Sequence, residues 1–132
     1  MTDEELIQKA AALIRPKRVK GGLCGDVGAA ALSASGKLFT GVCAATGSNV
    51  FCAEAAALGA MITAGEYRLA KVVAVWKDDD GKVFVIPPCG NCRQLMRELD
   101  EANLEAQVIL DKDKAIPLKE LLPYHDWWKK QE

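Results

Sequence analysis

The chain has 132 residues, half of them hydrophobic, which suffices for one substantial core but not for two domains of ordinary size. We therefore expect a single domain over residues 1–132. The 17 basic residues nearly balance the 18 acidic ones, and the pI is about 5.9. This balance argues against the basic surface that nucleic acids need and favours a small-molecule partner.

The N-terminal segment and the cysteine count indicate a cytoplasmic protein. The first residues are acidic and lack the basic start and apolar run of a signal peptide. No apolar stretch reaches the roughly 18 residues of a membrane span, so we expect no membrane partner. Five cysteines make an odd count, which argues against a disulfide framework and for reduced thiols.

The N-terminal part of the chain predicts a helix followed by a hairpin. Thr2 and Glu5 form a capping-box pattern, and apolar residues at helical spacing follow until Pro16. We expect residues 17–25 to form a basic, glycine-rich connection. Residues 26–43 then predict a hairpin, with apolar strands at 27–33 and 37–42 joined by a Ser-Gly turn.

A polar loop at 46–49 precedes an alanine-rich segment at 52–63, which predicts a second helix. The rest of the chain alternates between strand and helix patterns. We expect strands at 69–76, 83–86 and 107–110, a third helix at 90–100 and a short final helix at 117–122. Strands interleaved with helices of this length predict an α/β fold, with a mixed sheet covered by helices on both faces.

Two short cysteine-containing segments each open a predicted helix: Cys-Ala-Glu at 52–54 and Pro-Cys-Gly-Asn-Cys at 88–92. Cys89 and Cys92 are spaced to bind one metal ion from a single helical turn. With Cys52 as third ligand, they would hold a tetrahedral zinc ion (Zn2+) with one open position, as catalytic sites require. The positive ends of the two helices favour thiolate over thiol.

Glu54 follows the ligand Cys52 by two positions, which lets it reach a water molecule on the metal without binding the metal itself. Hydrolytic deamination needs a group that takes a proton from water and then delivers protons to the ring nitrogen and the departing amine. We expect Glu54 to be that group. We also expect Arg93, next to Cys92, to hydrogen-bond a ligand sulfur and reduce its negative charge.

Simpler interpretations exist for several of these residues. A Cys-x-x-Cys pair by itself is also typical of redox sites and structural zinc sites. A structural site has no need of Glu54, and it would more usually have a fourth protein ligand. Cys24 or Cys43 could supply that ligand, but isolated cysteines on strands are more often small hydrophobic residues. His125, the only histidine, is interpreted as a surface or packing residue.

The chain resembles the cytidine deaminase family over nearly its whole length. The resemblance is carried by Val-Gly-Ala-Ala at 27–30, Gly-Lys-Leu-Phe-Thr-Gly at 36–41, Cys-Ala-Glu at 52–54, Pro-Cys-Gly-Asn-Cys-Arg-Gln at 88–94 and Leu-Leu-Pro at 121–123. Three cysteines with a non-ligating glutamate are a signature of zinc deaminases. Residues 38–42 and the eleven-position step from Gly41 to Cys52 are most similar to blasticidin S deaminase.

The resemblance implies a three-layer α-β-α fold with a five-stranded mixed sheet. It also implies a homotetramer with active sites near subunit contacts. Trp127 and Trp128 at the end of the chain then have two interpretations. They could cover the core of their own chain, or Trp128 could reach a neighbour's pocket and bind the substrate by stacking.

The resemblance also bears on the substrate. In the family, an Asn and a Glu after the hairpin clamp the ribose hydroxyls, and a Phe before the first-strand motif lines the pocket. The matching positions here are Cys43, Ala45 and Gly25, which cannot make those contacts. Backbone groups around Ala53 and Pro87 can still contact the ring. We therefore expect plain cytidine to be a weak substrate.

Together these patterns predict a zinc-dependent hydrolytic deaminase. Its substrate would be a cytosine-type ring in a nucleoside-like compound, either cytidine or deoxycytidine or a blasticidin S-like antibiotic. Another small aminated heterocycle and a non-catalytic zinc-binding module stay open as alternatives. Deamination within a nucleic acid is disfavoured, because the charge is near neutral and only eight residues are aromatic.

Overall fold

The computed structural model describes residues 1–132, which form three α-helices and an eight-stranded sheet. The elements in chain order are α1 (Asp3–Ala11), β1 (Lys17–Val19), β2 (Gly22–Ser33), β3 (Leu38–Thr46), β4 (Val50–Phe51), α2 (Ala53–Thr63), β5 (Leu69–Lys77), β6 (Val83–Ile86), α3 (Gly90–Leu99), the 3-10 helix η1 (Glu101–Glu105), β7 (Gln107–Asp111), β8 (Lys114–Pro117) and the 3-10 helix η2 (Leu118–Leu121).

The sheet is mixed and has β2 and β5 at its centre. Its main path runs β4-β3-β2-β5-β7-β8, while β1 pairs with β2 and β6 pairs with β5. Only β5 and β7 run parallel, and the connection between them contains α3. The hairpin of β2 and β3 forms as the sequence predicts, with its turn at Ser35-Gly36.

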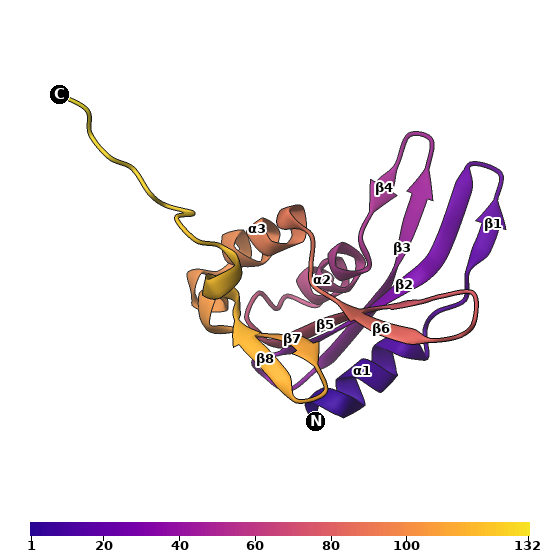
Figure 1. Ribbon diagram of the computed structural model, residues 1–132. Coiled ribbons are helices and arrows are strands. Elements are labelled where there is room, and N and C mark those ends of the chain that lie inside the picture. Colours follow the sequence, from indigo (N-terminus) through magenta and orange to yellow (C-terminus); the bar gives the residue numbers. More distant parts are fainter.

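Helices cover both faces of this sheet, so the α-β-α layering is as expected (Figure 1). Side chains along the central strands point alternately to the two faces of the sheet: in β5, Val72 and Ala74 face one layer, whereas Val73 and Val75 face the other. The second layer is α1. It buries its apolar side against β2 and β5, and Leu6 and Ala10 at its centre are fully buried.

The opposite face carries α2 and α3 and the larger core cluster. Helix α2 lies unusually close to β3 because Gly41 has no side chain. A Cβ atom at position 41 would lie 2.5 Å from the amide nitrogen of Ala57 and 2.9 Å from the carbonyl oxygen of Ala53. Real Cβ atoms do not make such short contacts, so the glycine fixes how deeply the start of α2 sits on the sheet.

The expected five-stranded sheet is wrong, because the sheet has eight strands. The extra strands, β1, β4 and β8, have two to four residues each and occupy segments without an alternating hydrophobic pattern. Lys17–Val19 and Val50–Phe51 are exposed throughout, so no buried face marks them in the sequence. They form because neighbouring strands offer unpaired backbone groups, which local patterns do not reveal.

The expected connection at 17–25 is wrong as well: it forms β1 and the start of β2, which pair with each other, so β2 begins at Gly22 rather than 27. β3 also runs on to Thr46. The remaining boundaries agree closely with expectation, apart from the C-terminal region. There the predicted helix at 117–122 is the short 3-10 helix η2, preceded by a strand. The last residues extend away from the body (Figure 1). The interpretation that Trp127 and Trp128 cover the core is wrong, since they are 66% and 90% exposed. None of the helices is long and apolar enough to span a membrane.

Candidate active site

The two cysteine-containing segments meet because each ends at the start of a helix on the same face of the sheet. Cys52 is the N-cap residue of α2 and Cys89 is the N-cap residue of α3, and both have extended backbone conformations. The Cys89 sulfur takes the place of a capping oxygen and accepts a hydrogen bond from the amide of Cys92 at 3.4 Å. Cys92 lies in the first turn of α3 and is fully buried.

The sulfur atoms of Cys52, Cys89 and Cys92 all lie within 4.8 Å of one another, and those of Cys52 and Cys89 are 3.3 Å apart. Two sulfurs bound to one tetrahedral zinc ion at about 2.3 Å each are separated by about 3.8 Å. The donor set therefore fits zinc with only small side-chain adjustments. Neither Cys24 nor Cys43 belongs to this cluster, so neither is placed to be a fourth ligand.

The thiols of this cluster differ in acidity. Burial and the hydrogen bond with Cys89 raise the pKa of Cys52 to about 11, and burial with the nearby Glu54 charge raises the pKa of Cys92. Burial also acts to raise the pKa of Cys89. Hydrogen bonds from the Cys92 amide and from the two neighbouring thiols outweigh it, so this pKa is lowered. Cys89 is thus the thiol best prepared to bind a cation as thiolate.

Glu54 lies in the first turn of α2, and its carboxyl is the only buried carboxyl group of the chain, with 4% exposure. Burial raises its pKa above the ordinary glutamate value, which favours the protonated form. A carboxyl with a raised pKa is a stronger base when ionised, which suits a group that takes a proton and returns it. The residue lies beside the three sulfurs and does not join their cluster.

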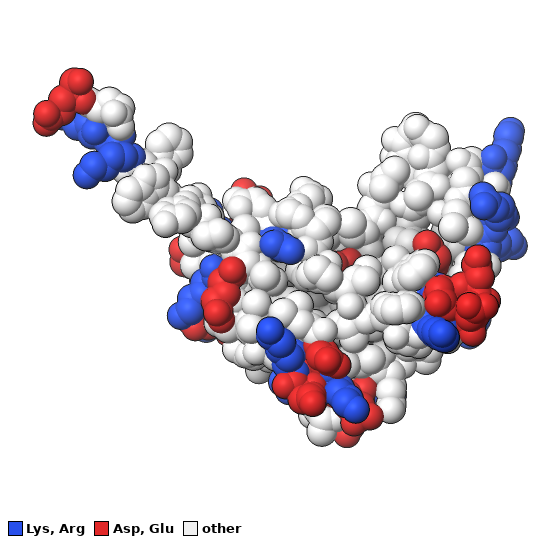
Figure 2. Space-filling view, viewed as in Figure 1, with Lys and Arg blue, Asp and Glu red and all other residues white.

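A pocket of about 310 Å3 opens next to the three cysteines, which is within the range of small-molecule sites. It is lined by residues of β2, β3, β4, β6 and the starts of α2 and α3. These are Asp26, Val27, Cys43, Ala44, Ala45, Val50, Phe51, Cys52, Ala53, Glu54, Ile86, Pro87 and Cys89. Figure 2 shows that the face carrying α2, α3 and the β3–β4 hairpin is mostly uncharged, with Lys, Arg, Asp and Glu at its margins.

The expected substrate-contact residues fall into two groups. Cys43, Ala45, Ala53 and Pro87 all line this pocket. Trp128 does not: it lies on the extended C-terminal segment, 90% exposed. Within one chain the structure therefore does not bring it to the site.

Arg93 lies beside the cluster but makes different contacts from those expected. Its Nε donates a hydrogen bond to the carbonyl oxygen of Pro88 at 2.8 Å, and its Nη1 donates to the carbonyl oxygen of Leu121 at 3.3 Å. Both acceptors are backbone oxygens rather than a ligand sulfur. The guanidinium group therefore joins the segment before Cys89 to the C-terminal 3-10 helix, a task that suits its several donors.

His125 also lies outside the cysteine cluster, as expected. It is a packing residue whose Nδ1 lies 2.8 Å from the carbonyl oxygen of Leu122.

Sequence patterns missed several residues of the pocket, and the most consequential is Asp26. Val50, Phe51 and Ile86 were missed because they lie on a short edge strand and at a strand end. Asp26 was missed because its position depends on an irregularity in β2. Gly25 has a φ of +81°, in the left-handed region, and here the pairing of β2 with β3 shifts register.

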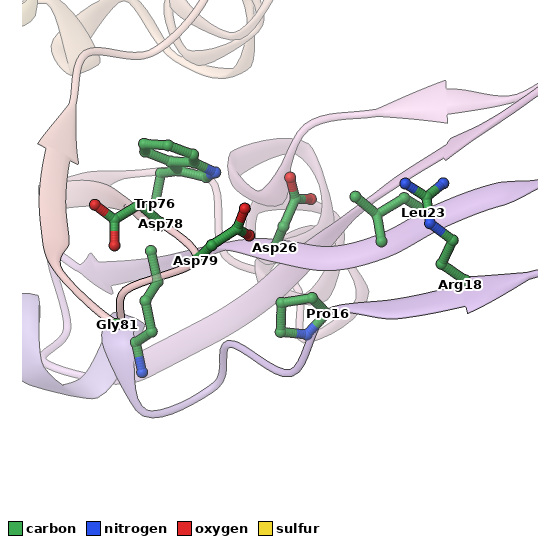
Figure 3. Close-up of a pocket in the computed structure, with 9 residues that line it drawn as sticks. Pro16, Arg18, Leu23, Asp26, Trp76, Asp78, Asp79 and Gly81 are labelled. Atoms are coloured by element: carbon green, nitrogen blue, oxygen red, sulfur yellow. The ribbon is translucent and has the colours of Figure 1, made fainter.

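A second hollow, of about 680 Å3, lies on the other side of Asp26 between β1, β2 and the β5–β6 turn (Figure 3). Its lining residues are Pro16, Arg18, Leu23, Asp26, Trp76, Lys77, Asp78, Asp79 and Gly81. Although it is larger, none of the cysteines of the cluster reaches it, and neither does Glu54. The smaller pocket is therefore the candidate active site.

Comparisons with solved structures place this arrangement among known proteins. Cytidine deaminase from Burkholderia pseudomallei is 30% identical, with a TM-score of 0.71 and coverage of 93% of this chain and 98% of that one. Cytidine deaminase from Mycobacterium leprae is 28% identical, with a TM-score of 0.69 and coverage of 91% and 96%. The Mycobacterium tuberculosis enzyme is 30% identical, with a TM-score of 0.66 and coverage of 90% and 89%.

The sequence itself agrees with this structural likeness. Residues 1–106 match the family model described as the cytidine and deoxycytidylate deaminase zinc-binding region. That segment includes both cysteine-containing motifs and Glu54. The convergence of three thiols beside a buried glutamate, the family match and the shared fold agree, and the chain belongs to the cytidine and deoxycytidylate deaminase family of zinc-dependent hydrolytic deaminases.

Proposed function

We propose that this protein hydrolyses the exocyclic amine of a cytosine-type ring in a nucleoside-like compound, yielding the carbonyl product and ammonia. We assign zinc binding to Cys52, Cys89 and Cys92 and proton transfer to Glu54. The observation that carries the proposal is the position of the only buried carboxyl group, Glu54, in the same pocket as two of the three converging thiols. A purely structural metal site would not need this buried acid.

The reaction needs an activated water molecule and a group that moves protons. Zinc with an open coordination position supplies the first, because it lowers the pKa of water. Glu54 supplies the second: it takes the proton from water during attack on the ring carbon that bears the amine. The protonated carboxyl gives this proton to the ring nitrogen. It then takes the second proton of the attacking water from the new C–OH group and gives it to the departing amine. One water molecule is consumed and one ammonia molecule leaves, so the carboxylate is regenerated.

The pocket also orients and shields the ring. Ala53 and Pro87 flank the cysteine cluster, and we propose that their backbone groups contact the polar edge of the ring. Apolar side chains such as Phe51 and Ile86 supply contacts to its faces and exclude water. The low dielectric of such a lining strengthens the interaction between Glu54 and the reacting groups.

The sugar side of the pocket supports a substrate other than plain cytidine. Cys43 and Ala45 line the pocket at the positions where the family resemblance places ribose-binding Asn and Glu residues. A thiol and a methyl group make weak or no hydrogen bonds to hydroxyls. We therefore propose a cytosine-type ring with a modified or bulky sugar-side group, as in blasticidin-type antibiotics, with cytidine and deoxycytidine as slower substrates.

We further propose that the chain works as a homotetramer, as the family resemblance implies. Val50 and Phe51, which line the pocket, are 74% and 47% exposed, and Trp127 and Trp128 are 66% and 90% exposed, so large apolar side chains are available for subunit contacts. In a tetramer, Trp128 could stack on a substrate in a neighbouring subunit. Light scattering at micromolar concentration tests this assembly, and a monomer would contradict both statements.

The test of substrate is ammonia release by the zinc-loaded protein with cytidine, deoxycytidine, cytosine and blasticidin S under one set of conditions. We expect blasticidin S to have the highest kcat/KM. A value for cytidine of about 10^5 M−1 s−1 or more would contradict our interpretation of Cys43 and Ala45, because that value is usual for a dedicated substrate. Adenosine and guanine are added as aminated compounds without a cytosine ring, and ammonia release from these alone would contradict the cytosine assignment.

A further inference from the structure

We propose that Asp26 determines the specificity of this pocket: its carboxylate favours substrates with a positively charged group on the sugar side over neutral or anionic ones. The inference rests on the proposed function, since it concerns the same pocket. It goes further, because it assigns a role to a residue that neither the motifs nor the family resemblance identifies.

The first observation is that an irregularity in β2 places Asp26 in the pocket wall. Strands β2 and β3 pair regularly up to Cys24 opposite Ala44 and again from Gly28 opposite Val42. Residues 25–27 of β2 thus face a single residue of β3, Cys43. Gly25 makes this possible through its positive φ, and a Cβ atom there would also lie 2.7 Å from the carbonyl oxygen of Arg15. Such bulges redirect side chains beside active sites.

The second observation is how the Asp26 carboxylate is held. Its Oδ1 accepts a hydrogen bond from the Cys43 thiol at 2.9 Å. Burial, together with this bond to Asp26, raises the pKa of Cys43, so the thiol stays protonated and remains a donor. This contact fixes the side chain in the wall of the pocket but provides no compensating charge. Asp26 has no basic partner within ion-pair distance, and its Oδ2 has no protein donor, so that oxygen can bind a ligand.

The third observation is the charge of the pocket as a whole. Asp26 and Glu54 are its only charged lining residues apart from the ligand thiols, and no Lys, Arg or His lines it. A substrate phosphate would therefore be repelled by a carboxylate, and no basic side chain of the pocket would offset this repulsion. A substrate ammonium group would instead form a charge-assisted hydrogen bond with Asp26, which is stronger than a bond between neutral groups.

The fourth observation concerns space. Asp26 also lines the second hollow, and Figure 3 shows its carboxylate directed away from Pro16. It thus stands between the pocket beside the cysteines and the larger hollow of about 680 Å3. A substituent that extends from the sugar past Asp26 has room there. The hollow is lined by Arg18 and Lys77 but also by Asp26, Asp78 and Asp79, so its acidic residues outnumber its basic ones. A bulky cationic group is therefore accommodated as well as attracted.

The test is a charge series on one ring. The zinc-loaded protein is assayed near pH 7 with 5′-amino-5′-deoxycytidine, cytidine and cytidine 5′-monophosphate. A fourth compound, 3′-amino-3′-deoxycytidine, carries the positive charge at another position of the sugar, so the test does not depend on where the charge lies. We expect kcat/KM to fall from the better amino compound through cytidine to the monophosphate, mainly through KM. In Asp26→Asn, which keeps the shape, the ratio of amino compound to monophosphate should fall about 10- to 100-fold.

Two further variants make the result specific. Asp26→Ser should lower the same ratio of kcat/KM values. It provides a second variant without the carboxylate in case Asp26→Asn folds poorly. Asp113→Asn changes an exposed aspartate in the turn between β7 and β8 that lines neither the pocket nor the second hollow, and it should leave the ratio within about twofold of the unsubstituted protein. A ratio that is unchanged in both Asp26 variants would overturn the assignment while leaving the proposed function intact.

If the protein is not a deaminase of cytosine-type rings, the outcome differs from a failure of the Asp26 assignment. If no compound releases ammonia, calorimetric binding of the same four compounds to the zinc-loaded protein replaces the kinetic ratio. Binding that follows the charge series and loses this order in Asp26→Asn supports the role of Asp26 without deamination. Binding that ignores charge, or the absence of binding by all four compounds, overturns the inference.

Discussion

The sulfur atoms of Cys52 and Cys89 lie 3.3 Å apart although the residues are 37 positions apart in the chain. They meet because each residue is the N-cap of its helix, and because both helices begin at the same end of one face of the sheet. The metal site is therefore built from the fold itself rather than from a flexible loop. The distances between the three sulfur atoms therefore depend on how closely α2 and α3 pack against the sheet.

The first prediction concerns metal content. The purified protein should hold one zinc ion per chain, and Cys89→Ser should lose most of it, because the change removes one of only three thiolate ligands. Cys24→Ser is the matched control, since Cys24 is a half-buried cysteine of β2 outside the cluster. Elemental analysis of the three proteins gives the answer. Full zinc occupancy in Cys89→Ser would show that the ligand set is different.

The second prediction concerns the packing of α2 against β3. Gly41→Ala should lower the free energy of unfolding by about 1–3 kcal/mol, because the new methyl group would lie 2.5 Å from the Ala57 amide nitrogen. The displaced helix start would also weaken zinc binding at Cys52. Gly59→Ala lies in the same helix with open space around it and should raise the stability by about 0.5–1 kcal/mol. Equal effects in the two variants would contradict the close approach.

The third prediction concerns pH. The Asp100 carboxylate accepts a hydrogen bond from the Ala102 amide and contacts the Arg68 guanidinium, and these partners lower its pKa below the ordinary value. A lowered pKa in the folded state contributes stability above the pKa of the unfolded chain, near 3.8, and this contribution is lost as pH falls through the folded pKa. Asp100→Asn should therefore have a lower Tm than the unsubstituted protein at pH 7.

The difference in Tm should begin to narrow only below about pH 3.8 and should keep narrowing as the pH falls through the lowered pKa of the folded state. Asn can still cap the following 3-10 helix, so the variant isolates the charge. Asp113→Asn, at an exposed position in the β7–β8 turn, serves as control and should show no such trend. A constant difference across the pH range would mean that the Asp100 charge does not contribute.

The chemistry of the site could be predicted from the sequence because its residues are local to two helix starts. Cys52 and Glu54 are two positions apart, and Cys89 and Cys92 are three apart, so each pair needs only one helical turn to take its place. Most of the two central strands was also predictable, since continuous runs of apolar and β-branched residues indicate strands that are buried on both faces. The first residues of β2 were not predicted. Both kinds of signal are contained in short windows of the chain.

Features that depend on distant parts of the chain were not predictable in this way. The position of Asp26 depends on a register shift between β2 and β3. Asn103 reads as an ordinary polar residue, yet it is fully buried. Its side chain accepts from the Leu69 amide at 2.8 Å and donates to the carbonyl oxygens of Tyr67 and Met96 at 2.9 and 2.8 Å. It thereby joins the end of α3 to the start of β5, a contact that no local pattern reveals.

The most direct test of the account measures ammonia release and zinc content together in the unsubstituted protein, in Glu54→Gln and in the exposed control Glu120→Gln. The substrate is the best one from the panel. We predict that all three proteins hold zinc, that Glu120→Gln is fully active, and that Glu54→Gln is slower by about 10^2- to 10^4-fold, the contribution of a positioned acid-base group. Unchanged turnover in Glu54→Gln, or loss of its zinc, would contradict the role of Glu54 as the proton-transfer group.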